Sequence, residues 1–112
     1  MQITIDQQEH VTIVAVNGSI DALTADTLVT ALQEQMQAGH TRLVAALADV
    51  EYTSSAGLRV LLGALKETRQ RGGDLRLAGM QQRVHRVLEL SGFTSILKVY
   101  PDVPSAVASY PA

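Results

Sequence analysis

Three consecutive hydroxyl residues, Thr53, Ser54 and Ser55, are the part of this sequence with the most obvious capacity for chemistry. They follow the segment DVEY and precede Ala56-Gly57 and a leucine-rich run. A serine at such a place can cap the following helix, attack a substrate as a nucleophile, help to hold a phosphate, or carry a regulatory phosphate itself. The residues around the three hydroxyls discriminate among these roles.

A catalytic serine is not indicated by the local sequence. The nucleophile elbow of α/β-hydrolases needs the pattern G-x-S-x-G, because glycines permit its strained turn. The sequence reads T-S-S-A-G around Ser55 and Y-T-S-S-A around Ser54, so the upstream glycine is missing from both. The histidines, His10, His40 and His85, fall in two predicted loops and on a helix flank, without the sequence context of a general base. We therefore expect a protein that is not an enzyme.

Sites for a nucleotide, a metal or a cofactor are not indicated either. The sequence contains neither the P-loop pattern G-x-x-x-x-G-K-[ST] nor the dinucleotide pattern G-x-G-x-x-G. A receiver-type phosphoaspartate site would need two neighbouring acidic residues at the end of one strand, whereas Asp21 and Asp49 stand alone near the ends of separate strands. No cluster of His, Asp and Glu has the spacing of metal ligands, and without cysteine there is no disulfide or thiol chemistry. We expect no metal and no cofactor.

Two roles remain for the serines, and one side chain can serve both. Serine is a favoured N-cap, whose side-chain oxygen accepts a backbone N–H bond worth about 1 kcal/mol. A helix N-terminus also accommodates an anion, because its first N–H groups are free and the helix dipole is positive there. Phosphorylation adds about −1.5 to −2 charges at pH 7 and would change this surface without unfolding the protein. Ser54 or Ser55 is thus a cap, a switch, or both.

The residue pattern predicts a small mixed α/β sheet with the order β-β-α-β-α-β-α-β-α. Alternating or β-branched runs predict strands, and apolar residues recurring at spacings of three and four predict helices. Strands are expected over residues 3–6, 11–16, 42–50, 74–79 and 95–100, and helices over 24–38, from the serines to 71, over 81–91 and from 102 onward. The first two strands should form an antiparallel edge hairpin around the loop 7–10, and the later crossovers imply parallel pairing.

The apolar faces of three helices predict a core beneath the sheet. The residues expected to point inward are Ala25, Leu28, Val29, Leu32 and Met36 in the first helix, Leu58, Leu61, Leu62 and Leu65 in the second, and Val84, Val87 and Leu88 in the third.

Length and composition indicate the class of protein. With 112 residues, 46% of them hydrophobic and 18% charged, the chain has the balance of one globular domain spanning residues 1–112. The net charge of −2 provides no electrostatic footprint for nucleic acid or an anionic membrane. The N-terminus lacks the features of a signal peptide, and no apolar run approaches the ~20 residues of a membrane span. We expect a soluble, cytoplasmic protein.

The segment YTSSAGLRVLL resembles the signature of STAS domains, in particular of stand-alone bacterial anti-sigma factor antagonists. Members typically carry Asp-Ser-Ser-Gly-Leu at the end of a strand and before an apolar helix. With Gly57-Leu58 in register, Ser55 occupies the phosphoacceptor position, Ser54 replaces the acidic residue before it, and Ala56 replaces the second serine.

Three further stretches resemble the family in the same order along the chain. VNGSIDALTADTL is similar to the exit of its second strand and its first helix, RGGDLRLAGMQQRVHRVLELSGF to its fourth strand and third helix, and ILKVYPDVPSAVAS to its last strand and C-terminal helix. The resemblance therefore covers nearly the whole chain.

The resemblance implies a non-enzymatic partner switch with the STAS fold. In such systems the unphosphorylated antagonist binds a GHKL-type serine kinase that doubles as an anti-sigma factor. ATP-dependent phosphorylation of the antagonist releases this partner, and a PP2C-type phosphatase reverses the modification. Carried over to this sequence, Ser55 is the phosphorylated residue, with Ser54 as the second choice. The partner-binding residues are Asp21, Ser54, Ser55, Gly57 and Arg59.

Three points stay open at the level of sequence. The lost carboxylate at position 54 removes a negative charge beside the acceptor, which bears on recognition by a kinase. The chain could instead be a STAS module that is not phosphorylated and serves as an assembly subunit or a ligand-binding domain. Self-association into a weak homodimer is also left open.

Overall fold

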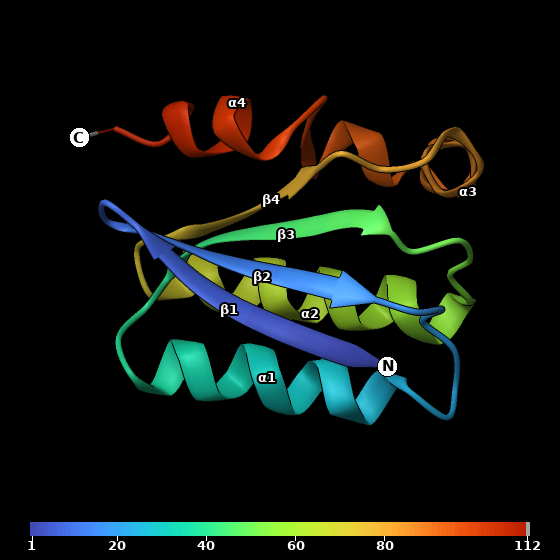
Figure 1. Ribbon diagram of the computed structural model, residues 1–112, viewed down its shortest axis with the longest axis horizontal. Coiled ribbons are helices and arrows are strands. Elements are labelled where there is room, and N and C mark those ends of the chain that lie inside the picture. The colour runs from blue at the N-terminus through green and yellow to red at the C-terminus, as the bar shows by residue number, and fades with distance from the viewer. Residues whose placement is uncertain (112) are drawn as a thin grey trace.

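A five-stranded sheet with helices on both faces organises the chain in a computed structural model that describes residues 1–111 (Figure 1). The strands are β1 (Gln2–Gln8), β2 (Val11–Asn17), β3 (Arg42–Asp49), β4 (Asp74–Ala78) and β5 (Lys98–Tyr100). The helices are α1 (Ala25–Gln37), α2 (Ser55–Gln70), α3 (Gln82–Leu90) and α4 (Val103–Ala108), with a short 3-10 helix at Phe93–Ser95. The predicted order of elements is confirmed. Within residues 1–111, no helix is both long enough and apolar enough to cross a membrane.

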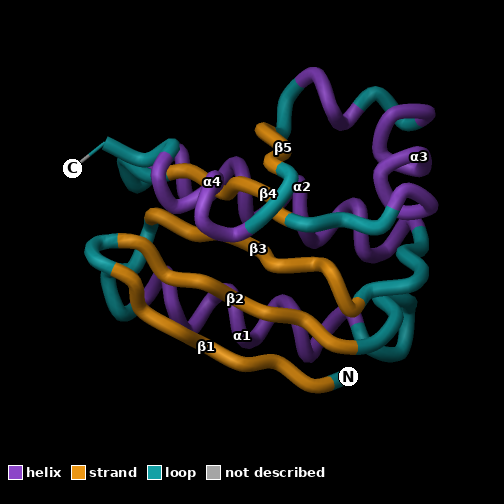
Figure 2. Tube along the Cα trace, turned by 45° about the horizontal axis from the view of Figure 1, so that its top comes forward, coloured by secondary structure: helices purple, strands orange, loops and turns teal. Residues whose placement is uncertain are grey.

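The strands lie side by side in the order of the sequence (Figure 2). β1 is an antiparallel edge strand paired with β2, as predicted, and the other three pairings are parallel. The hairpin is tighter than the predicted loop 7–10, because β1 continues to Gln8, which pairs with Val11. The turn therefore consists of Glu9 and His10 alone, and Glu9 adopts the positive φ, 58°, that two-residue hairpin turns require.

The main core lies between the sheet and helices α1 and α2, which cover the same face in Figure 1. Most of the predicted inward residues are buried: Ala25, Leu28, Leu32, Met36, Leu58, Leu61, Leu65, Val84 and Leu88. Leu62 and Val87 are only partly buried at its border. Val29 departs from the prediction, since it is 37% exposed and lines a groove between α1 and α2.

Helix α4 packs on the opposite face of the sheet through a smaller apolar cluster that includes Tyr110. The Tyr110 hydroxyl lies 2.7 Å from the carbonyl oxygens of Leu43 and Asp74 and can donate to one of them at a time. Burial, and then the negative charge of Asp74, raise the pKa of Tyr110 well above its usual range. Arg76 lies 4.0 Å from the centre of the Tyr110 ring and pairs with Asp74 at 3.1 Å. These contacts hold the end of the chain where β3 and β4 begin.

The last strand is shorter than the predicted span 95–100. The backbone N–H of Leu97 donates to the carbonyl oxygen of Phe93 at 2.9 Å, which closes a turn after the 3-10 helix. Only Lys98 to Tyr100 pair with β4, because residues 95–97 belong to this turn.

Candidate functional site

Two loops at the carboxyl ends of β2 and β3 are joined by a short parallel bridge between Ile20 and Thr53. The N–H of Ile20 donates to the carbonyl oxygen of Tyr52 at 2.9 Å, and the N–H of Ser54 donates to the carbonyl oxygen of Ile20 at 2.8 Å. Asp21 follows Ile20 and Ser54 follows Thr53, so the bridge places these two predicted site residues next to each other. Their proximity depends on a contact between segments more than thirty residues apart.

Gly57 allows helix α2 to approach this bridge closely. A Cβ atom at this position would lie 2.7 Å from Cγ2 of Ile20 and would overlap Oγ1 of Thr53. Both neighbours are buried, with exposed fractions of 1% and 3%, so neither can move aside easily. The glycine in the predicted motif therefore has a packing role directly behind the serines.

The two serines differ sharply in exposure. Ser54 stands at the N-cap position of α2 in an extended conformation, but its side chain accepts no capping hydrogen bond. Its Oγ is buried and has no hydrogen-bond partner among the described residues. Ser55 is the first residue of α2 and is exposed. The expectation that a serine side chain caps this helix is thus not met, and the accessible hydroxyl is that of Ser55.

Asp21 has a clear local structural task. Its Oδ1 accepts hydrogen bonds from the N–H groups of Leu23 and Thr24, at 2.9 and 3.0 Å, and from the Thr24 hydroxyl at 3.2 Å. In return, the N–H of Asp21 donates to Oγ1 of Thr24 at 2.9 Å. This reciprocal pattern has the form of a capping box, but it closes the turn just before α1, whose N-cap is Thr24, and so it shapes the entry to the helix. Its Oδ2 makes no hydrogen bond within residues 1–111, so one carboxylate oxygen remains available beside the serines.

The N-terminus of α2 is electrostatically suited to a negative group. The N–H groups of Ser55, Ala56 and Gly57 have no hydrogen-bond acceptor within residues 1–111. The first turn of the helix contains no acidic residue. Free N–H groups and the positive end of the helix dipole favour an anion at this place.

Large apolar side chains that sequence reasoning did not select are exposed on the two loops that the bridge joins. Leu23, in the loop after Asp21, is 92% exposed, and Tyr52, just before Thr53, is 52% exposed. Both lie outside the helical stripes, next to the motif. Large apolar residues in the loops that flank a polar motif were the signal that could have identified them.

A groove of about 350 Å³ runs between α1 and α2, beginning at the N-terminal ends of the two helices. Its walls are mainly apolar and include Val29, Ala56, Val60 and Gly63. Arg59 also lines the groove, is exposed, and makes no hydrogen bond or ion pair within residues 1–111. The groove therefore connects Arg59 with the surface around Ser55.

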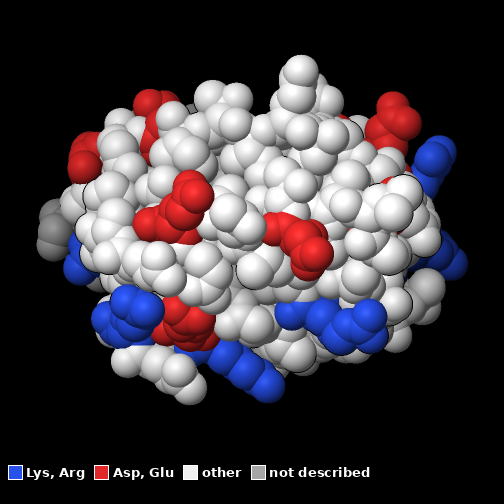
Figure 3. Space-filling view, turned by 90° about the horizontal axis from the view of Figure 1, so that it is seen from below, with Lys and Arg blue, Asp and Glu red and all other residues white. Residues whose placement is uncertain are grey.

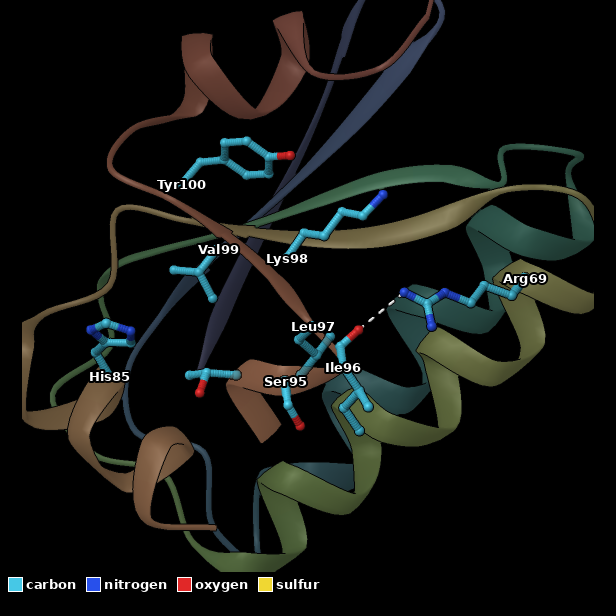
Figure 4. A pocket seen from close by; sticks show the side chains of 9 residues that line it. Arg69, His85, Ser95, Ile96, Leu97, Lys98, Val99 and Tyr100 are labelled. Carbon is cyan, nitrogen blue, oxygen red and sulfur yellow. Dashed lines mark hydrogen bonds between the residues drawn. The ribbon is translucent and has the colours of Figure 1, made fainter. Parts of the chain in front are cut away.

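A second hollow, of about 650 Å³, follows β5 and none of the predicted site residues lines it (Figure 4). Figure 4 shows Arg69 reaching from α2 to the carbonyl oxygen of Ile96, a hydrogen bond of 3.0 Å. Arg69 also pairs with Asp74 at 3.0 Å, and Lys98 lies 3.9 Å from the same carboxylate. These contacts tie α2 to β4 and β5. Within residues 1–111 no group of three potential metal ligands occurs.

Comparison with known proteins identifies the family. The family model described as STAS domain matches residues 2–106. BtrV of Bordetella bronchiseptica is 36% identical over 110 residues, covering 98% of this chain and 95% of that protein. The anti-sigma F factor antagonist of Paenibacillus polymyxa is 30% identical, covering 96% and 92%. The crystal structure of an anti-sigma factor antagonist from Mycobacterium paratuberculosis has the same fold, with a TM-score of 0.88 at 24% identity, covering 96% of this chain and 92% of that one. The chain belongs to the STAS domain family.

Proposed function

We propose that this protein is an anti-sigma factor antagonist that binds its partner when Ser55 is unmodified and releases it when Ser55 is phosphorylated. The names of relatives that span nearly the whole chain support the class of function. The observation that carries the assignment to Ser55 is the contrast in exposure: Ser55 is exposed at the first position of α2, whereas the Ser54 hydroxyl is buried. A kinase needs access to the hydroxyl that it modifies.

The partner-binding surface consists of Asp21, Ser54, Ser55 and Arg59 together with the exposed Leu23 and Tyr52. Exposed apolar groups surrounded by polar ones are typical of protein interfaces, which bury apolar area at their centre and keep polar groups at the rim. Gly57 contributes by holding α2 against the bridge between the loops. The groove between α1 and α2 continues this surface, and we assign it to an apolar side chain of the same anti-sigma factor.

The switch is electrostatic. A GHKL-type serine kinase transfers the γ-phosphoryl group of ATP to Oγ of Ser55, the hydroxyl loses its proton, and ADP leaves. The phosphate brings about −1.5 to −2 charges to a surface that already carries Asp21. Docking would then bury the phosphate close to Asp21, at a cost in desolvation of the new charge and in repulsion between the two negative groups. Hydrolysis by a PP2C-type phosphatase returns the hydroxyl and inorganic phosphate. This cycle requires ATP and therefore a cytoplasmic setting.

Capture from lysate of the source cell, with wild-type protein and two Ser55 variants as baits, tests the proposal. Ser55→Ala should retain an ATP-binding kinase of the anti-sigma class, because it can acquire no phosphate and adds no charge to the surface. Ser55→Asp should stay folded and lose that protein, because it places a charge on the helix N-terminus. Ser54→Ala is the matched control: Ser54 is partly exposed through its backbone and Cβ atoms, which alanine keeps, and the hydroxyl that the change removes is buried, so this variant should behave like wild type.

The captured kinase should then phosphorylate wild-type protein on Ser55 in the presence of ATP, as located by mass spectrometry. Equal capture of the same partner by Ser55→Ala and Ser55→Asp would refute the switch. Absence of phosphate from residues 53–55, together with a stable oligomer, would instead indicate an unphosphorylated assembly module.

A further inference from the structure

Arg59 is the only Lys or Arg within about one turn of Ser55 on helix α2. Arg59 stands four residues after Ser55 on α2, a rise of about 6 Å along the helix. Side chains of a helix lean toward its N-terminus, so the residue at i+4 lies over the turn that carries residue i. An anion placed N-terminal to a cation at this spacing is also the favourable order with respect to the helix dipole.

Other cations are not supplied by the neighbouring loop and helix. Residues 1–41, which include β1, β2, the Asp21 loop and α1, contain no Lys or Arg. Figure 3 looks onto the face covered by α1 and α2, and it shows most of the Lys and Arg side chains in its lower half and most of the Asp and Glu side chains in its upper half. The two loops at this end of the sheet carry the acidic residues Asp21 and Glu51. A phosphate on Ser55 would therefore add negative charge to an end of the molecule whose loops are acidic, and Arg59 is the nearby cation on its own helix.

Arg59 is free to respond to a new charge. It is exposed, and it makes no hydrogen bond or ion pair within residues 1–111. In the unmodified protein Arg59 lines the groove between α1 and α2, whose walls also include Val29 and Val60. A guanidinium group donates two parallel hydrogen bonds to phosphate oxygens. These charge-assisted bonds are stronger than hydrogen bonds to a neutral acceptor, so a phosphate on Ser55 would attract the Arg59 side chain.

We infer that Arg59 is the intramolecular receptor of the phosphate on Ser55, and that its side chain leaves the groove when it binds the phosphate. This inference rests on the proposed phosphorylation of Ser55. Binding of Arg59 to the phosphate gives the switch a second effect besides added charge. In the unmodified protein the guanidinium group is available to the partner, and in the phosphorylated protein it is bound to the phosphate. This binding also extends the change from Ser55 to the groove, one helical turn away.

The test uses full-length protein with phosphoserine incorporated at position 55 during translation, so that no kinase is required. The second ionisation of the phosphate, with an ordinary pKa of about 6, is followed by phosphorus NMR between pH 4 and 8. Arg59→Gln should raise this pKa relative to wild type by about 0.2–0.4 of a unit, because it removes a neighbouring positive charge. Arg59→Lys should retain most of the wild-type value.

Two features of the design isolate Arg59. Asp21 and Glu51 are present in every variant, so their effect cancels in the comparison. Lys66→Gln removes one charge from an exposed position of the same helix, eleven residues from Ser55, or about 16 Å along the axis, which exceeds the Debye length of about 8 Å at physiological salt. This control should titrate like wild type. Equal phosphate pKa values for wild type and Arg59→Gln would overturn the inference.

Methyl NMR of Val29 tests the second half of the inference. Phosphorylation should shift the Val29 methyl signals in wild type, because Arg59 leaves the groove, and should leave them unchanged in Arg59→Gln. Equal shifts in both proteins would contradict the movement of Arg59. Neither measurement involves the anti-sigma factor, so a failure here is distinguishable from a failure to capture that partner.

Discussion

Replacement of Gly57 by alanine should destabilise the protein, although the same change normally stabilises a helix. Gly57 lies in the first turn of α2, where its added Cβ would meet two buried side chains, Ile20 and Thr53. Overpacking of this kind typically costs about 1–3 kcal/mol of unfolding free energy. The gain in helix propensity from Gly to Ala is about 1 kcal/mol in a helix interior and smaller at its end. The net expectation is a loss of about 1–2 kcal/mol.

Gly63 provides a matched control on the same helix. It is exposed, and a Cβ atom there would meet nothing within 4 Å. Gly63→Ala should therefore stabilise the protein by up to about 1 kcal/mol, from helix propensity alone. Urea denaturation of both variants measures the two free energies, and they should change in opposite directions. For a domain of this size the difference corresponds to a separation in Tm of roughly 10 °C.

A double-mutant cycle identifies the cause of the loss. Thr53→Ala removes the Oγ1 atom that the new Cβ would overlap, so Gly57→Ala should cost less in the Thr53→Ala background than in wild type. A Gly57→Ala variant as stable as Gly63→Ala would refute the argument, because it would show that the bridge between the two loops relaxes freely. The register of Asp21 against Ser54 would then not be held by packing.

Two further predictions concern helix capping. At the N-cap of α2 the Ser54 side chain makes no capping hydrogen bond, whereas at the N-cap of α4 the Asp102 side chain makes one. Ser54→Ala should change the free energy of unfolding by less than about 0.5 kcal/mol, because the Ser54 hydroxyl is buried without a hydrogen-bond partner. Loss of an N-cap that makes its hydrogen bond usually costs ~1 kcal/mol. A loss of about 1 kcal/mol or more in urea denaturation would show that the Ser54 hydroxyl is hydrogen-bonded. Asp102 does cap α4, accepting from the N–H of Ser105 at 2.8 Å, and the hydrogen bonds from Ser105 lower the pKa of Asp102 below its ordinary 3.8. Since the folded-state pKa is the lower one, the stabilisation is complete above about pH 4 and is lost as the pH falls below it. Asp102→Ala should therefore be less stable than wild type at pH 7, and the difference in thermal stability should shrink at pH 3. A difference independent of pH would contradict an ionised cap. Asp102→Asn keeps a hydrogen-bond acceptor at the N-cap and serves as the control.

The elements were accessible from the sequence because their signals are local. The leucine stripe of α2, the apolar recurrence in α1 and the glycines after α1, α2 and α3 depend on residues within one or two turns. The predictions that failed have two causes. The exposure of Val29 depends on a distant segment, because α2 forms the second wall of its groove. The shorter β5 has a local cause, because a turn closed by the hydrogen bond from Leu97 to Phe93 takes up the residues before Lys98.

The sequence by itself determined the order of the strands and helices and the position of the hydroxyl-rich motif between a strand and a helix, since periodicity and turn residues are properties of short segments. The register of the motif on Gly57 came from its resemblance to the STAS family. The tertiary structure decided which serine is exposed, since that depends on the phase of α2 against the Ile20–Thr53 bridge. It also decided that Asp21 lies beside Ser54, that Leu23 and Tyr52 are exposed there, and that Gly57 packs against both loops. The position of Asp21 beside Ser54 and the contact of Gly57 with Ile20 join residues more than thirty positions apart, which no local pattern encodes.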